Sequence, residues 1–366
     1  MKILQIVSGT HVNGATLHAV KISELLAARG HEVVLLKRPH FDQDTVAKDI
    51  RAIDSSLKRN VGEVRRIGAL CKAEKIDVIH THMSSAHAFG ALLRIFYRVP
   101  CVATVHKLNL QLHWPVNDIV LCHNEESMRY MRRVNLVRPS RLRLVRPFID
   151  ERQIGLPRQP RESLLARFEL PAGRPILIAI GHFIPRKGLM DIVEALPRIV
   201  AAGHDPLVVF CGWTGDADYR AALKARIAAL GLADRIRWFE KVSDEDRIHL
   251  ARCADLFVQA SHEETGPATV LEAMAQALPV VGTRCGTMPE FIVPGVTGDL
   301  VSVARPDEMA ASVVRLLGDP AALKRMGAAG LQRFRDLYTA SGNMGLIERA
   351  YADAHALARP SRSITG

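Results

Sequence analysis

The sequence predicts an α/β protein made of two doubly wound domains with parallel sheets. Short apolar runs rich in β-branched residues alternate with amphipathic helical stretches, which is typical of parallel sheets covered by helices on both faces. The chain has 366 residues, more than one hydrophobic core usually holds, so two domains are expected. Its content of 48% hydrophobic and 24% charged residues is that of a globular protein rather than a disordered one.

The alternation begins at the N-terminus and predicts a first domain over residues 1–160. Its first strand, Ile3–Val7, is apolar for too few residues to be the core of a signal peptide. A helix is expected from about Ala15 to Arg29, where Gly30 ends it, and a basic helical stretch is expected from about Asp44 to Lys75. The other strands of this half are expected at Val33–Leu36, Val78–His80, Cys101–Val105 and Ile119–Cys122.

A loose stretch over residues 150–175, containing several prolines, separates the halves, and a second domain is expected over residues 170–343. Ligands of such folds bind at the carboxyl ends of the strands, so the loops there are candidate sites. The expected strands are Ile176–Ile180, Leu207–Cys211, Ile236–Phe239, Leu256–Gln259 and Pro279–Gly282. The expected helices are Gly188–Ala201, Asp218–Leu230, Asp244–Arg252 and Thr269–Ala277.

The net charge of +11 is concentrated in the first half of the chain. Residues 1–150 carry 23 Lys and Arg against 13 Asp and Glu, and arginines crowd residues 129–146. A basic half attracts an anionic membrane surface, a lipid-linked acceptor or another anion, whereas a solvated helix face is the simpler alternative. Because no nucleic-acid motif accompanies the charge, no nucleic-acid partner is expected.

The spacing of the cysteines and the hydropathy of the chain indicate where in the cell the protein is expected. The six cysteines are scattered without a C-x-x-C pair, which is typical of a reducing compartment, and no apolar run is long enough to span a membrane. We therefore expect a cytoplasmic protein that can associate peripherally with the inner face of the cell membrane.

Three loops that contain glycine follow strands and precede helices, where backbone amides can hold a phosphate or a sugar hydroxyl. Residues 8–15 include Asn13 and Gly14 but match neither a P-loop nor G-x-G-x-x-G, and a plain turn is the alternative interpretation. Residues 181–188 end with the adjacent cations Arg186 and Lys187, which indicate an anion in front of the next helix. The third loop, residues 282–290, includes Gly286, Thr287 and Met288.

The most specific pattern is a pair of glutamates separated by seven residues. Glu264 follows a strand, Glu272 lies in the first turns of a helix, and a Gly-Pro turn lies between them. Glu272 is placed to accept hydrogen bonds from two ribose hydroxyls.

The string E-T-G-P-A-T-V-L-E-A-M-A over residues 264–275, followed by P-V-V, resembles the E-x7-E signature of glycosyltransferase family 4, the retaining GT-B glycosyltransferases. This resemblance implies two Rossmann-like domains facing across a cleft, an acceptor-binding N-terminal domain and a C-terminal domain that binds a nucleotide-sugar. It also implies a final helix, within about 344–366, that packs back onto the N-terminal domain. Weaker similarities are found at residues 30–33, 77–82, 104–106, around Lys187 and at 298–301.

By the same resemblance, the sequence implies specific roles for its residues. Glu264 orients the donor sugar, Lys187 neutralises the leaving diphosphate, and His106 lies near the donor sugar and the acceptor. Together these three form the implied catalytic group. The implied donor-binding residues are Asn13, Gly14, Arg186, Lys187, Glu272, Gly286, Thr287 and Met288. His182 stands where the family usually has an arginine.

The resemblance implies retaining transfer of a sugar from a nucleotide-diphosphate sugar to a hydroxyl acceptor on a glycan or lipid, in cell-envelope, exopolysaccharide or glycolipid biosynthesis. It favours front-side attack, with the leaving phosphate as base. The alternatives are a sugar-nucleotide epimerase, a phosphorylase, which would need pyridoxal phosphate, and a catalytically silent nucleotide-sugar-binding protein.

No cofactor or essential metal is expected. The D-x-D patterns at Asp42–Asp44 and Asp216–Asp218 precede helices, so capping explains them better than metal binding. Histidines are frequent between residues 80 and 113, but no H-E-x-x-H pattern is present and no metal site is predicted.

Overall fold

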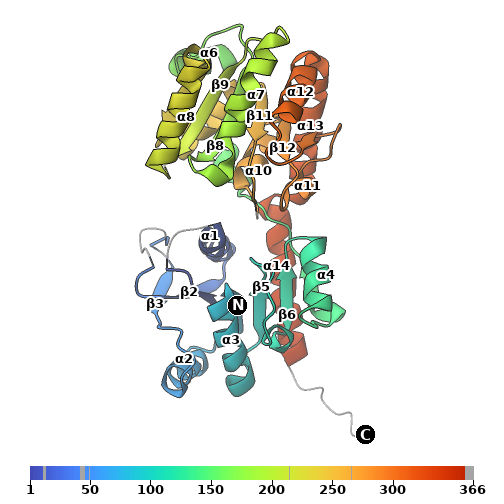
Figure 1. Ribbon diagram of the computed structural model, residues 1–366. Coiled ribbons are helices and arrows are strands. Elements are labelled where there is room, and N and C mark those ends of the chain that lie inside the picture. Colours follow the sequence, from blue (N-terminus) through green and yellow to red (C-terminus); the bar gives the residue numbers. More distant parts are fainter. Residues whose placement is uncertain (11–13, 42–45, 49, 214, 265, 359–366) are drawn as a thin grey trace. The chain divides into compact units, whose positions relative to one another are not determined.

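The chain folds into two α/β units, each built on one parallel sheet (Figure 1). The computed structural model describes residues 1–10, 14–41, 46–48, 50–213, 215–264 and 266–358. The first unit contains Met1–Arg146 and the segment that begins at Ala340, and the second is Pro147–Thr339. The loose stretch 150–175 lies within the second unit, where it forms the short helices α5 (Glu151–Ile154) and α6 (Arg161–Arg167).

The first unit has a seven-stranded sheet in the order β3-β2-β1-β4-β5-β6-β7. All of its neighbouring strands are parallel, and every residue of β4 is buried, as expected for a sheet covered on both faces. The strands are β1 (Lys2–Val7), β2 (Glu32–Lys37), β3 (Arg51–Asp54), β4 (Val78–His82), β5 (Cys101–Thr104), β6 (Ile119–Cys122) and β7 (Leu142–Leu144). The helices are α1 (Gly14–Ala28), α2 (Val61–Ala73), α3 (Ser84–Tyr97), α4 (Glu125–Arg133) and α14 (Ala340–Ala358), with 3₁₀ turns at Trp114–Val116 and Pro139–Arg141.

The basic helical stretch expected from Asp44 to Lys75 is wrong in its first part. Arg51–Asp54 forms β3, which pairs in parallel with β2 at the edge of the sheet. The helix begins only after Asn60, whose side chain accepts a hydrogen bond from the backbone amide of Glu63. Tertiary pairing with β2 therefore decides the structure of this segment, where local periodicity predicts a helix.

The final helix α14 is part of the first unit, where it contacts α1, β4, β5 and β6. Tyr351 of this helix is fully buried, and its hydroxyl lies 2.7 Å from Nδ1 of His80. At the rim, Glu348 accepts two hydrogen bonds from the guanidinium of Arg29, at 2.7 and 2.8 Å. The helix is thus held to the first unit by an apolar face, by buried polar contacts of Tyr351 with Gln5 and His80, and by ion pairs of Glu348 and Asp353.

The second unit has a six-stranded parallel sheet in the order β10-β9-β8-β11-β12-β13. Its strands are β8 (Ile176–His182), β9 (Leu207–Trp213), β10 (Ile236–Glu240), β11 (Leu256–Gln259), β12 (Val280–Thr283) and β13 (Gly298–Val301). Besides α5 and α6 its helices are α7 (Leu189–Ala201), α8 (Ala217–Ala229), α9 (Asp244–Cys253), α10 (Ala268–Ala275), α11 (Met288–Phe291), α12 (Pro306–Leu317) and α13 (Pro320–Leu337), with 3₁₀ turns at Pro185–Lys187 and Ala233–Arg235.

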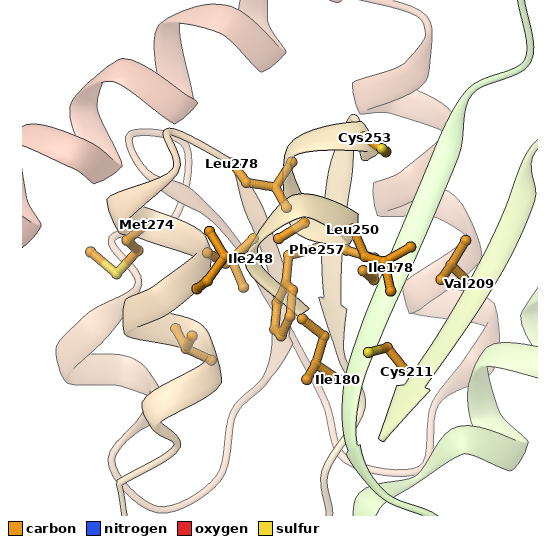
Figure 2. Packing of buried hydrophobic residues seen from close by; sticks show 14 of the residues in the cluster. Ile178, Ile180, Val209, Cys211, Ile248, Leu250, Cys253, Phe257, Met274 and Leu278 are labelled. Carbon is orange, nitrogen blue, oxygen red and sulfur yellow. The ribbon is translucent and has the colours of Figure 1, made fainter. Parts of the chain in front are cut away.

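Alternate residues of these strands enter two separate cores, one on each face of the sheet. Ile178 and Ile180 of β8 face one core, and Leu177 and Ala179 face the other. Figure 2 shows the first core, in which strand residues from β8, β9 and β11 meet residues of α9 and α10 such as Ile248. Burial on both faces explains why these strands are apolar along their whole length.

None of the helices within the described ranges is long and apolar enough to cross a membrane.

Candidate active site

In the second unit, four polar side chains converge on one buried carboxylate at the carboxyl end of β11. Oε1 of Glu264 accepts hydrogen bonds from Nζ of Lys187 at 2.5 Å, Oγ of Ser261 at 2.7 Å and Nε2 of Gln259 at 2.9 Å. Glu264 is only 7% exposed, so this charge is removed from water and depends on these partners. Arg186 lies farther away, with Nη1 4.0 Å from the other oxygen of the Glu264 carboxylate.

Two glycines allow the loops around this carboxylate to pack directly against the main chain at the end of β11. Gly188 has a φ of +64° and Gly286 a φ of +47°, a left-handed region that other residues rarely adopt. A Cβ on Gly188 would overlap the carbonyl oxygen of Ala260, and a Cβ on Gly286 would overlap that of Glu264. The second and third loops predicted from the sequence therefore both close onto the end of β11.

Hydrogen bonds between the loops hold this arrangement. The backbone amide of His262 donates to the carbonyl of Arg186 at 2.8 Å, and the guanidinium of Arg186 donates to the carbonyl of Glu263 at 2.9 Å. The hydroxyl of Thr283, at the end of β12, donates to the carbonyl of Ser261. Lys187 is thus fixed beside Glu264 by main-chain contacts on both sides.

Glu272 lies on α10 in a bidentate ion pair with Arg247 of α9. Nε and Nη2 of Arg247 donate to the two carboxylate oxygens at 3.0 and 2.9 Å, and both side chains are largely buried. A bidentate guanidinium fixes the plane of a carboxylate, so Arg247 determines the direction in which Glu272 presents its remaining lone pairs.

The third loop presents main chain rather than side chains. Met288 is fully buried in the core, so its thioether faces away from any ligand. Within the described ranges, the amides of Gly286 and Thr287 donate to no backbone carbonyl, and the buried hydroxyl of Thr287 has no hydrogen-bond partner. These donors are consistent with an anion or hydroxyl at the loop.

His182, which stands in place of an arginine, is exposed at the end of β8. Its ring lies 5.6 Å from that of Trp213, measured between centroids, and this aromatic neighbour is itself partly exposed.

Of the two D-x-D patterns, the described one is a helix cap. The side chain of Asp216 accepts a hydrogen bond from the amide of Tyr219 at 2.9 Å and starts α8, which confirms the capping interpretation. Asp42 and Asp44 lie outside the described residues.

In the first unit, the predicted site residues lie at the carboxyl ends of the strands, among several buried histidines. Gly14 begins α1, and Asn13 lies outside the described residues. His106 follows β5, and its Nε2 lies 3.2 Å from Nδ1 of His82 at the end of β4. Burial, followed by the effect of neighbouring histidines, holds the pKa of His106 well below its usual range, so the ring is neutral at pH 7.

A pocket of about 380 Å³ opens beside His106 in the first unit. Its lining combines polar side chains, namely those of Ser8, Ser84, Ser85, Lys107 and Asn109, with apolar surface, to which Trp114 contributes an aromatic ring. Such a lining suits a hydroxylated ligand, which needs several hydrogen-bond partners and one apolar face.

Comparison with known proteins covers most of the chain. The model described as "Glycosyl transferases group 1" matches residues 160–333, and the model described as "Glycosyltransferase Family 4" matches residues 12–153. The chain belongs to glycosyltransferase family 4.

Relatives of this family 4 glycosyltransferase match it over much of their length. It is 24% identical to N-acetyl-alpha-D-glucosaminyl L-malate synthase of Bacillus anthracis, over 93% of this chain and 94% of that protein. It is 27% identical to D-inositol 3-phosphate glycosyltransferase of Thermobispora bispora, over 80% of this chain and 74% of that protein.

Solved structures show the GT-B fold of this family 4 chain. A glycosyltransferase from Rickettsia africae has a TM-score of 0.85 and 18% identity, covering 96% of this chain and 98% of its own. Anabaena HepE in complex with UDP has a TM-score of 0.82 and 19% identity, covering 96% of this chain and 100% of its own.

The close approach of Gly286 to Glu264 can be tested with a Gly286→Ala substitution. We expect Gly231→Ala, at a φ of +66° with open space around it, to cost about 1–2 kcal/mol from backbone strain alone. Gly286→Ala should cost at least about 1 kcal/mol more, because the loop must also move away from the carbonyl of Glu264. Urea unfolding of both variants gives the difference, and equal costs would contradict the close contact.

Proposed function

We propose that this family 4 glycosyltransferase transfers a sugar from a nucleotide-diphosphate sugar to a hydroxyl acceptor, with retention of configuration and without an essential metal. The observation that carries the proposal is the pair of glutamates of the second unit, of which Glu264 is buried against Lys187 at the end of β11 and Glu272 is oriented by Arg247 on α10. Glu264, Lys187 and Glu272 each match one part of such a donor. Anabaena HepE, a structural neighbour, binds UDP.

Lys187 is assigned to the diphosphate. Breaking the bond between the sugar C1 and the phosphate oxygen transfers negative charge to the leaving diphosphate, and a fixed cation stabilises that charge in the transition state. The ammonium of Lys187 has three donors, of which Glu264 takes one, so others remain for phosphate oxygens. Arg186 and the amides of Gly286 and Thr287 supply further donors for the same anion.

Glu272 is assigned to the ribose of the nucleotide. Its carboxylate plane is fixed by Arg247, and each oxygen keeps a lone pair that can accept a hydroxyl hydrogen bond. Arg247 is then a positioning residue, because it acts through Glu272.

Glu264 is assigned to orienting the donor sugar rather than attacking it. Three hydrogen bonds end on its Oε1, and they spread the negative charge and reduce the nucleophilicity of that oxygen. Oε2 is left to accept a sugar hydroxyl. Retention then follows from front-side attack, in which the acceptor oxygen bonds to C1 as the bond to the phosphate breaks. The acceptor proton passes to the leaving phosphate.

His106 and the adjoining pocket of the first unit are assigned to the sugar and its acceptor. A neutral imidazole accepts a hydroxyl hydrogen bond without placing a cation beside a developing positive charge on the sugar. The pocket beside it is large enough for a small hydroxylated group and has several polar side chains in its lining.

The acceptor is proposed to be lipid-linked, because the first unit combines exposed leucines with arginines. Asn135 is buried and joins two loops, since it donates to the carbonyl of Asn109 at 3.1 Å and accepts from the amide of Gln111 at 2.9 Å. Leu110, Leu112 and Leu136 are 65%, 90% and 74% exposed on these joined loops. Arg132, Arg133 and Arg138 are also exposed and lie close to Leu136 in the sequence. Apolar side chains among cations suit the surface of an anionic membrane.

A panel of UDP-, GDP- and ADP-sugars tests the donor site by thermal shift. A ligand at about 100 times its Kd stabilises the folded state by about 2.7 kcal/mol, so one nucleotide-sugar should raise the Tm by roughly 5–10 °C. Glu272→Gln should remove most of this shift, because an amide accepts fewer hydrogen bonds and loses the pair with Arg247. Glu194→Gln, which breaks an exposed bidentate pair with Arg226 in the same unit, is the matched control and should keep the shift. Absence of stabilisation by every nucleotide-sugar would contradict the donor site.

The stereochemical course is read from the product by proton NMR. We expect the new glycosidic bond to have the anomeric configuration of the donor, and EDTA to leave the rate of transfer unchanged.

A glycosylated Glu264 recovered by mass spectrometry would contradict the role of Glu264 as the residue that orients the donor sugar. Donor binding with neither transfer nor hydrolysis would favour a catalytically silent binding protein.

Membrane association is tested by sedimentation with vesicles. Phosphatidylglycerol vesicles should bind the protein more strongly than phosphatidylcholine vesicles, and salt should weaken the binding. Leu110→Ser and Leu112→Ser should each weaken it by at least about tenfold, because a buried leucine contributes about 1.5–3 kcal/mol. Val296→Ser, at an exposed position of the second unit, is the control. Equal binding of all three variants to the vesicles would show that Leu110 and Leu112 are not part of a membrane-binding surface.

A further inference from the structure

We propose that His18, His106 and His123 of the first unit form a binding site for a divalent transition-metal ion such as Zn²⁺. One ring nitrogen from each of the three histidines lies within 4.8 Å of those from the other two. The rings are partly buried, and the centroid of His18 lies 5.5 Å from that of His106 and 5.2 Å from that of His123. The site goes beyond the proposed transfer reaction, in which the ion takes no part.

The sheet brings two of these histidines together by register. In the pairing of β5 with β6, Thr104 lies opposite Leu121. His106 and His123 each come two residues after this pair, just past the ends of the two strands, so the register brings them to the same edge of the sheet. The third ring comes from α1, which also contacts β4, so the ligands derive from three separate elements. Local spacing could not reveal this group.

Hydrogen bonds leave a ring nitrogen available on His123 and on His106. Nδ1 of His123 lies 3.0 Å from the carbonyl of Val145 and must donate to it, which leaves the lone pair on Nε2. Nε2 of His82 lies 2.9 Å from Oε1 of Gln5 and donates to it, so Nδ1 of His82 accepts. His106 therefore donates from Nε2 to His82 and keeps a lone pair on Nδ1. Histidines that bind metals are held in the same manner, with the second ring N–H donated to a carbonyl or another acceptor.

The protonation state of these three histidines is also suitable for binding a metal ion. Burial, before any other cause, lowers the pKa values of His18, His106 and His123 from the usual value for histidine. The three rings are thus neutral at pH 7, and no proton has to be displaced when an ion binds.

Three imidazoles select the class of ion. Imidazole nitrogen suits Zn²⁺, Cu²⁺, Ni²⁺ and Co²⁺, whereas Mg²⁺ and Ca²⁺ prefer oxygen ligands. Tetrahedral zinc bound by three histidines keeps its fourth position for water or an anion. His106 also lines the pocket of about 380 Å³, so an ion bound here would occupy the side chain assigned to the sugar. Zinc should therefore inhibit transfer rather than support it.

The experiment titrates the full-length protein, first freed of metal with EDTA, with Zn²⁺ by calorimetry and with Co²⁺ by visible absorption. We expect one ion per chain and the d–d absorption of a four-coordinate Co²⁺ site. His18→Gln and His123→Gln should each weaken binding by at least about tenfold, since the loss of even an outer-shell partner costs about 10–100-fold. His113→Gln, at a partly buried histidine of the same unit outside the trio, should bind as the unchanged protein does.

Circular dichroism and the Tm show whether each variant is folded. Folded His18→Gln and His123→Gln proteins that bind Zn²⁺ as tightly as the unchanged chain would overturn the site, and so would the absence of stoichiometric binding. Neither readout requires a donor or an acceptor, so failure of the metal site is distinguishable from failure of the proposed transfer reaction.

Discussion

The second unit depends on main-chain contact at the carboxyl end of β11. Gly188 and Gly286 bring two loops against the carbonyls of Ala260 and Glu264, at a separation where no Cβ fits. This contact places Lys187 beside a buried carboxylate, which its neighbours then satisfy. The position of this buried ion pair therefore depends on a backbone constraint.

The candidate sites of the two units differ in their chemical groups. The site of the second unit is built on buried ion pairs, Lys187 with Glu264 and Arg247 with Glu272. The first unit also buries an ion pair, Arg94 with Asp118, but its candidate site is surrounded by neutral histidines, of which His80 has its pKa lowered to about 3 by burial. Burying paired charges suits a diphosphate ligand, and burying neutral rings suits sugar hydroxyls and, in our proposal, a metal ion.

Much of the fold could be predicted from the sequence, because strands buried on both faces are continuous apolar runs. Ile3–Val7 and Leu256–Gln259 are examples that lie within or coincide with β1 and β11. The segment around Arg51–Asp54 could not be predicted, because only pairing with β2 makes it a strand. The composition of the loops with Lys187 and Gly286 indicates that they are candidate binding loops. Only the tertiary structure brings both loops into contact with Glu264.

Residues that act through long-range contacts gave no local signal. Arg247 lies in an acidic helix start, and nothing in its neighbours connects it with Glu272, 25 residues later. From the sequence, Gln259 is predicted only to be the last residue of a strand. His18 is remote in sequence from His106 and His123, and only the sheet register and α1 bring the three rings together.

The place of α14 determines the order in which this protein can be completed during synthesis. The second unit is one continuous segment, Pro147–Thr339, so all of its strands are available before the last helix leaves the ribosome. The first unit is begun first but is completed only after the second, because the Tyr351 side chain that covers His80 follows Thr339 in the chain. A nascent chain must therefore keep an open sheet face until α14 has been made, which is a period when such a chain is exposed to aggregation and to chaperones.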